Sequence, residues 1–313
     1  MSTANAAWLS IIRAANRKSK NSYFLRRVGI YSYIWLVQMN RFLPPPRVFL
    51  NGPPKTGTHL LSDCLSLMPK MMFSGRHFAL PDFFVRSSQA ESQTSTPSEY
   101  VALNSSRLRK FLAKCPQGMF ITGHARFHPD LQVLLRDLQL RHVLLIRDPR
   151  DVVVSHTFFV KHMSLHPQHR YFMNVLTTDA ERIMASIRGF GPASVDNDAF
   201  ISIPDIFTKF SRWLDDPSVL IVRFEDLVGV QGGGESKTQL ENITAIAHFI
   251  DRPLSQTQVK DIAQRMYGKG GLTFRKGQTG DWRNHFTEAH KQAFKEVAGD
   301  LLIRFGYETD MCW

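Results

Sequence analysis

The sequence is poor in cysteine. Among 313 residues it has three cysteines, at positions 64, 115 and 312, and no two of them form a C-x-x-C pair. This pattern excludes a disulfide-stapled scaffold and a zinc ribbon, and it indicates a reducing compartment, so we expect a cytoplasmic protein. The apolar fraction of 43% excludes a disordered or collagen-like chain.

Acidic residues are absent from the first 47 positions, which hold eight lysines and arginines. This segment accounts for eight of the twelve net positive charges, and the rest of the chain is nearly balanced. We interpret residues 1–46 as a basic N-terminal arm and residues 47–313 as one domain. Such an arm can bind a membrane surface or a polyanion. A polyanion-binding module stays an alternative, but we expect no specific nucleic-acid partner.

The arm also lacks an apolar run long enough to cross a bilayer. Residues 28–39 form an apolar stretch of about a dozen residues, whereas a membrane span needs roughly 20. Three prolines at 44–46 end this stretch, and no small-residue cleavage site follows it. Two interpretations stay open: a helix packed on the domain, or an interfacial helix that gives peripheral membrane contact through residues 8–43.

Short apolar runs alternate with helical patterns along the rest of the chain. We expect strands over 47–51, 119–122, 142–146 and 219–223. Helical patterns cover 59–68, 130–139, 237–250, 255–266 and 287–305, and a further helix begins near 151. This alternation predicts the α/β class, a P-loop-like three-layer α/β/α fold with a central, mostly parallel sheet.

The first chemical motif is the loop 52–59 (GPPKTGTH) between an expected strand and an expected helix. Backbone N–H groups and the helix dipole in such a loop attract an anion, and Lys55 adds a full charge. Thr58 is the expected N-cap. A Walker loop has Lys directly after its second glycine, but Thr58 follows Gly57 here. This departure disfavours a P-loop kinase or NTPase, which stays the alternative enzyme.

The second motif is residues 147–155 (RDPRDVVVS). Arg147 ends an expected strand, which is where open α/β sheets place ligands, and its guanidinium suits a phosphate. Ser155 lies on the following helix, where it can reach the same anion. Asp148 is the expected cap of that helix. A structural ion pair between Arg147 and Asp151 is the alternative explanation of the motif.

These motifs resemble those of the sulfotransferases that use 3′-phosphoadenosine 5′-phosphosulfate (PAPS). Residues 54–58 (PKTGT) resemble the family's 5′-phosphosulfate loop, and residues 147–152 with Ser155 resemble its 3′-phosphate motif. Residues 275–284 (RKGQTGDWRN) resemble its C-terminal RKGxxGDWKN segment. The three motifs occur in the family's order, so the resemblance covers most of the chain from residue 47.

The resemblance implies the roles of individual residues. The 5′-phosphosulfate is expected to contact Lys55, Thr56, Gly57, Thr58 and His59. The 3′-phosphate is expected to contact Arg147, Ser155, Arg275, Lys276 and Gly277, and Phe224 is expected to line the adenine pocket. PAPS would be the co-substrate and adenosine 3′,5′-bisphosphate (PAP) the product, with no metal required.

The catalytic base is expected to be His124, because it follows a strand and aligns with the family's catalytic histidine. Thr122 stands where the family has a lysine, and His128 is the alternative base. Lys55 would stabilise the charge that develops on the leaving phosphate.

The acceptor is expected to be a small molecule. The segments that would face it are 74–98, 124–130 and 158–200, which are rich in Phe, Met and His. They favour an apolar or aromatic alcohol, a phenol or a lipid-like acceptor, while a carbohydrate or an amine stays open. The sequence predicts no oligomeric state.

Overall fold

A single sheet of five parallel strands forms the centre of the molecule. The computed structural model describes residues 46–85, 102–190, 202–267 and 276–313. The strands are β1 (Arg47–Asn51), β2 (Met72–Ala79), β3 (Met119–His124), β4 (Leu140–Ile146) and β5 (Val219–Arg223). Their order in the sheet is β2-β3-β1-β4-β5, and every neighbouring pair is parallel. The sequence predicted four of these five strands.

The unpredicted strand, β2, is irregular. Its pairing with β3 shifts register between Phe73 and His77, and Gly75 within it has a φ of 76°. The shift interrupts the alternation of apolar and polar side chains that a sequence pattern detects. Residues 74–79, expected among the segments facing the acceptor, therefore belong to an edge strand.

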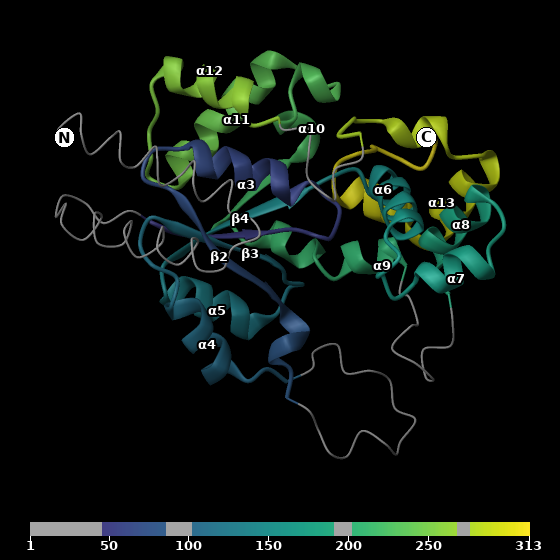
Figure 1. Cartoon of the computed structure of the whole chain (residues 1–313), viewed down its shortest axis with the longest axis horizontal. Coiled ribbons are helices and arrows are strands. Elements are labelled where there is room, and N and C mark those ends of the chain that lie inside the picture. Colours follow the sequence, from purple (N-terminus) through teal and green to yellow (C-terminus); the bar gives the residue numbers. More distant parts are fainter. Residues whose placement is uncertain (1–45, 86–101, 191–201, 268–275) are drawn as a thin grey trace.

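Side chains of the central strands alternate between two hydrophobic cores. Val48 and Leu50 of β1 belong to one core, whereas Phe49 between them belongs to the other. The first core is covered by α3 (Thr58–Leu67), α11 (Ser236–Phe249) and α12 (Gln256–Arg265). The second is covered by helices that include α4 (Ser105–Ala113) and α5 (Pro129–Asp137). Figure 1 shows the helices on both sides of the sheet, which confirms the three-layer α/β/α fold.

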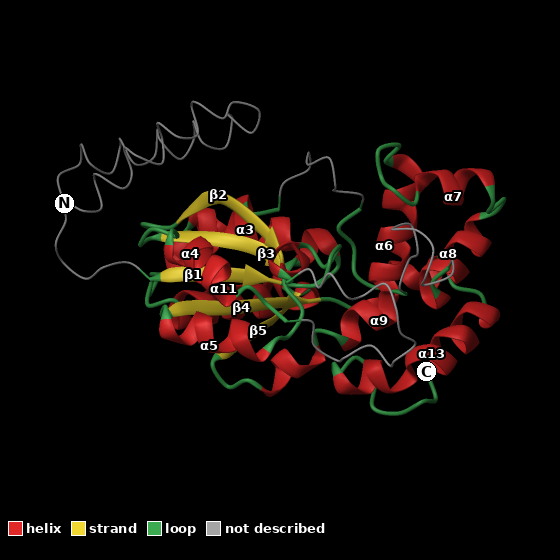
Figure 2. Cartoon of the chain, turned by 90° about the horizontal axis from the view of Figure 1, so that it is seen from below, coloured by secondary structure: helices red, strands yellow, loops and turns green. Residues whose placement is uncertain are grey.

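A further group of helices lies beyond the carboxyl ends of the strands (Figure 2). It contains α6 (Pro149–His162), α7 (His169–Asn174), α8 (Asp179–Arg188), α9 (Ile203–Thr208) and α13 (Glu288–Arg304). The remaining helical segments are short: η1 (Leu80–Phe83), η2 (Ser211–Asp215), α10 (Phe224–Leu227), η3 (Val230–Gly232) and η4 (Asp281–Asn284). The loops after β1, β3, β4 and β5 all meet this group of helices at the same edge of the sheet.

The helix starts at this edge were predicted with one error. Asp148 caps α6 as expected, because its side chain accepts a hydrogen bond from the backbone N–H of Arg150. The expected cap of α3, Thr58, is instead the first residue of that helix, and Gly57 is the N-cap. Gly57 adopts a left-handed conformation, with φ 96° and ψ 30°, which glycine reaches at low steric cost. Helix α3 therefore has its N-cap one residue earlier than the position predicted from the hydroxyl of Thr58.

None of the described helices is long and apolar enough to cross a bilayer. Residues 1–45 of the basic arm, residues 86–101 and Arg275 lie outside the described residues.

Candidate active site

The loop after β1 folds tightly against the end of β4. Thr56 is fully buried, and its hydroxyl donates a hydrogen bond of 2.8 Å to the carbonyl of Pro53. A Cβ atom on Gly52 would lie 2.5 Å from the carbonyl oxygen of Leu145, so this close approach requires glycine. The start of the loop after β1 is thereby held against the end of the neighbouring parallel strand β4.

The remaining residues of the loop face outward from this packed base. Lys55 has a φ of 69°, and its ammonium lies 3.7 Å from the centroid of the Phe159 ring on α6. Gly57 and Thr58 are partly exposed, and His59, on the first turn of α3, is exposed. A cation, hydroxyl groups and the start of a helix thus lie together at the carboxyl edge of the sheet, which is a favourable environment for an anion.

Phe224 joins this loop to the second motif. It is the first residue of α10, directly after β5, and it is 4% exposed. A Cβ on Gly57 would lie 2.5 Å from its ring, and the guanidinium of Arg147 lies over the same ring, 4.3 Å from the centroid. One buried aromatic side chain therefore contacts both predicted anion-binding segments.

Arg147 is buried at the end of β4. One Nη donates to the carbonyl of Gln278 at 2.7 Å and lies 3.7 Å from the carboxylate of Asp151. The ion pair expected as an alternative explanation therefore exists, but it is long. The Nε atom of Arg147 is buried and has no hydrogen-bond partner among the described residues. The guanidinium accordingly keeps one buried donor that no described residue satisfies.

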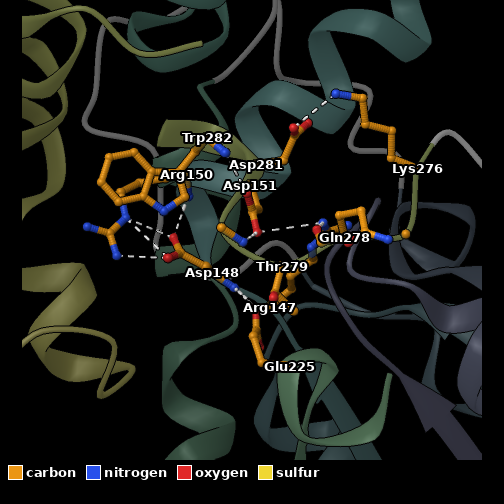
Figure 3. A network of polar contacts seen from close by, with 12 residues as sticks. Arg147, Asp148, Arg150, Asp151, Glu225, Lys276, Gln278, Thr279, Asp281 and Trp282 are labelled. Carbon is orange, nitrogen blue, oxygen red and sulfur yellow. Dashed lines mark hydrogen bonds and ion pairs between the residues drawn. The ribbon is translucent and has the colours of Figure 1, made fainter. Parts of the chain in front are cut away.

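Asp151 fastens the C-terminal segment to α6. Its two carboxylate oxygens accept hydrogen bonds from the backbone N–H groups of Gly280 (2.7 Å) and Trp282 (2.9 Å). Figure 3 shows this carboxylate between the start of α6 and the segment that follows Lys276. The second and third motifs, about 130 residues apart in sequence, therefore adjoin each other. Burial raises the pKa of Asp151, and the nearby Arg147 charge opposes that rise.

A buried carboxyl group supports the Arg147 loop from the other side. Glu225 accepts a hydrogen bond from the backbone N–H of Asp148 at 2.9 Å and another from the Tyr307 hydroxyl at 3.1 Å. Burial raises the pKa of Glu225 to about 7, despite these hydrogen bonds and the nearby Arg147 charge. The sequence analysis did not identify Glu225, because burial of a carboxyl group cannot be detected in a single sequence.

His124, the predicted base, lies at the end of β3 against the loop of residues 52–59. Its Nδ1 is 2.7 Å from the carbonyl oxygen of Gly52, and a carbonyl only accepts, so Nδ1 carries the proton. Burial lowers the pKa of His124 to about 4, and the neighbouring His77, His59 and Lys55 charges lower it further. The ring is therefore neutral at pH 7, with the lone pair on Nε2.

His77 of β2 is a neighbour of His124 that the sequence analysis missed. The two ring centroids are 5.0 Å apart in an edge-to-face arrangement, and His77 Nδ1 lies 3.0 Å from the Thr122 hydroxyl. Thr122, which stands where the family has lysine, thus contacts a histidine instead. A correct prediction of β2 would have placed His77 beside β3.

His128, the alternative base, has a structural contact. It is the N-cap of α5, and its Nδ1 accepts a hydrogen bond from the backbone N–H of Asp130 at 3.1 Å. This bond satisfies one of the open N–H groups at the helix start, so the ring orientation is set by α5.

The other predicted residues have more varied positions. Ser155 is buried on the second turn of α6. The Lys276 ammonium pairs with Asp281 at 3.0 Å, and Gly277 has a φ of 62°. Within the described residues, no group of three His, Cys, Asp or Glu side chains is arranged to bind a metal ion.

A cavity of about 600 Å³ lies at the opposite end of the strands. Its walls include Pro46 before β1, Leu140 at the start of β4 and Trp213 of η2. It is therefore separate from the residues described above.

The fold and these contacts define the class of protein: a three-layer α/β/α domain with a strand-to-helix loop packed beside a buried arginine. The family model for the sulfotransferase domain matches residues 45–269. The chain belongs to the sulfotransferase domain family.

Individual relatives are distant. Sulfotransferase 6B1 of Danio rerio is 26% identical over 59% of this chain and 60% of its own length. Sulfotransferase 2A6 of Mus musculus is 25% identical, over 52% of this chain and 56% of its own length. These matches therefore span less than two thirds of both relatives. Flavonol 3-sulfotransferase of Flaveria bidentis is 23% identical over 82% of both chains.

Solved structures share the fold. A mouse sulfotransferase, SULT7A1 complexed with PAP, matches with a TM-score of 0.55 and 18% identity, over 84% of this chain and 89% of its own. Retinol dehydratase in complex with androsterone and PAP matches with a TM-score of 0.51 and 19% identity, over 84% and 82%.

Proposed function

We propose that the protein transfers a sulfuryl group from PAPS to a hydroxyl group, or to an amine, of a small acceptor, leaving PAP. The observation that carries the proposal is the contact of Phe224 with both Gly57 and Arg147. A nucleotide with two separate anionic ends needs two such binding segments beside a shared aromatic surface. The PAP named in the structures of two fold relatives supports this nucleotide.

The residues divide the binding of PAPS between its two ends. Lys55, Thr56, Gly57, Thr58 and His59 would contact the 5′-phosphosulfate. Arg147 and Ser155, with Arg275, Lys276 and Gly277, would contact the 3′-phosphate, and Phe224 would pack against the adenine. Contacts to the 3′-phosphate would select PAPS over ATP and would fix the direction of attack.

Chemistry would occur by in-line displacement. The acceptor oxygen forms a bond to sulfur while the bond from sulfur to the bridging phosphate oxygen breaks. His124 Nε2 takes the acceptor proton, since its Nδ1–H is held by the Gly52 carbonyl. Lys55 and the loop N–H groups stabilise the charge on the departing phosphate oxygen.

Transfer of radiolabel from PAPS to a panel of alcohols, phenols and amines tests this proposal. We expect labelled product with at least one acceptor, and none from the Lys55→Ala variant. Equal phosphoryl transfer from labelled ATP would instead favour a kinase.

The role of the N-terminal arm is inferred from the sequence, because residues 1–45 lie outside the described residues. We propose that residues 8–43 provide peripheral membrane contact for this enzyme, on the basis of their basic charge and short apolar stretch. Co-sedimentation with vesicles rich in phosphatidylserine should be lost at high salt, because such attraction is screened. Binding that is unchanged after deletion of residues 1–43 would overturn this proposal.

A further inference from the structure

Two cations, Arg126 and Lys209, lie near each other just after the strand that ends at the proposed base. Arg126 follows His124 by two residues in an extended segment, where Ala125 and Phe127 are buried while His124 and Arg126 are partly exposed. Alternate residues of an extended chain point to the same side. Arg126 and His124 therefore face the same side, roughly 7 Å apart along the backbone.

The backbone around Arg126 is held firmly at both ends. Asn51 at the end of β1 makes two hydrogen bonds of 2.8 Å to the backbone of Ala125. The N–H of Phe127 donates to the carbonyl of Lys209, the C-cap residue of α9, at 2.9 Å. These bonds bring Lys209 next to Arg126, although 83 residues separate them in the sequence.

The two positive charges have no paired carboxylate within the described residues. No ion pair there involves Arg126 or Lys209, and the guanidinium of Arg126 lies over the Phe84 ring, 4.7 Å from its centroid. Partial burial lowers the pKa of Lys209, and the Arg126 charge lowers it further, whereas Asp205 acts in the opposite direction. Holding two cations close together is unfavourable unless an anion joins them.

We propose that Arg126 and Lys209 bind a carboxylate of the acceptor, so that the preferred substrates are hydroxy acids with an apolar or aromatic spacer. This inference rests on the proposed sulfotransferase function and specifies its substrate class. The ring of Phe84 covers one face of the Arg126 guanidinium. The edge of the guanidinium can donate the two parallel hydrogen bonds that a carboxylate accepts. Because Arg126 and His124 are two residues apart and face the same side, a hydroxyaryl acid held by Arg126 would direct its phenol toward His124.

The test compares hydroxyaryl carboxylates of graded spacer length with their methyl esters, which lack the charge. For the wild type, we expect kcat/KM to be about tenfold to a hundredfold higher for the best acid than for its ester. The Arg126→Gln variant should lose this preference by lowering kcat/KM for the acid while leaving that for the ester unchanged. Lys209→Gln should cause a smaller loss of the same kind.

Arg136→Gln is the matched control, because Arg136 is an exposed arginine of α5 that lines the cavity at the opposite end of the strands. Arg126→Glu should further favour an aminoalkyl phenol over the acid. Equal kcat/KM values for acids and esters in the wild type, or equal losses for both in Arg126→Gln, would overturn the inference while leaving the sulfotransferase function intact. Failure of labelled PAPS to sulfate any acceptor, acid or ester, would overturn both.

Discussion

His124 differs from His128 in which nitrogen has a free lone pair: the Nδ1–H of His124 is held by the Gly52 carbonyl and leaves Nε2 as a base beside the loop, whereas Nδ1 of His128 accepts the backbone N–H of Asp130. We predict that His124→Ala lowers kcat by about 10²- to 10⁴-fold, because the acceptor proton loses its positioned base. The affinity for PAP should stay within about threefold of the wild type, since His124 is not placed among the phosphate-binding groups. Steady-state kinetics and calorimetric titration with PAP measure the two effects.

The matched control is His128→Asn. Asparagine can still accept the hydrogen bond from the backbone of Asp130, so the start of α5 is preserved and kcat should be retained. A larger loss of kcat in His128→Asn than in His124→Ala would reverse the assignment of the base.

Glu225 makes the folded protein less stable as pH rises, whereas an ordinary ion-paired carboxylate makes it more stable. Its folded pKa of about 7 lies above its usual value of 4.5, so the folded state holds the proton more tightly. This contribution to stability is complete below pH 4.5 and is lost as pH rises to about 7. We predict that Glu225→Gln gains thermal stability relative to the wild type between pH 5 and pH 8, as measured by differential scanning calorimetry.

Glu181→Gln provides the comparison for this experiment. Hydrogen bonds to the backbone N–H and hydroxyl groups of Thr177 and Thr178 lower the pKa of Glu181 to about 2, so it is ionised throughout this range. Its stability difference from the wild type should therefore not change with pH. A flat difference for Glu225→Gln as well would show that Glu225 is not protonated in the folded protein.

Among individual residues, the sequence predicted those with a recognisable local pattern. Lys55, Gly57, Arg147 and His124 each follow a strand, and the structure brings all four to one edge of the sheet. Glu225 and His77 could not be predicted, because their environments are created by segments distant in sequence. Thr58 was placed wrongly as a cap, since the left-handed conformation of Gly57 already turns the chain.

At the scale of elements, the carboxylate of Asp151 makes two backbone hydrogen bonds that join α6 to the C-terminal segment. We predict that Asp151→Asn weakens PAP binding by about tenfold to a hundredfold, because an amide cannot accept both backbone hydrogen bonds and carries no charge. The segment that holds Lys276 and Gly277 would then keep its hydrogen bond from Arg147 to the Gln278 carbonyl but lose its two bonds to Asp151. Calorimetric titration with PAP measures the loss.

Arg188→Gln breaks an exposed ion pair with Glu296 and serves as the control for Asp151→Asn. Surface pairs contribute little to stability, so PAP binding should be unchanged. Wild-type affinity in Asp151→Asn would show that the C-terminal segment binds no phosphate.

The strands and helices that were predicted have continuous apolar runs or helical periods, whereas α4, α7, α8 and α9 were not predicted. Strand β2 was not, since its register shift removes the alternation on which prediction depends. Residues 86–101 carry no periodic pattern in the sequence, so the acceptor side of the site was predicted only by composition.

At the scale of the whole molecule, the C-terminal segment belongs to the same unit as the sheet. The family model ends at residue 269, yet the backbone of residues 280 and 282 is bonded to Asp151. The motifs at 52–59 and 147–155 each follow a predicted strand. Parallel strands place their carboxyl ends at one edge of the sheet, so the sequence predicted that these motifs lie close together. The charge asymmetry of the chain predicted a separate arm, which stays a prediction.

The account depends on the binding of one nucleotide at both of its anionic ends, and calorimetric titration with PAP and with adenosine 5′-monophosphate tests it directly. We expect the wild type to bind PAP at least about a hundredfold more tightly, because only PAP has a 3′-phosphate for Arg147. Arg147→Gln should remove this preference without weakening the monophosphate, whereas Lys55→Gln should weaken both. Equal affinities of the wild type for the two nucleotides would contradict the account.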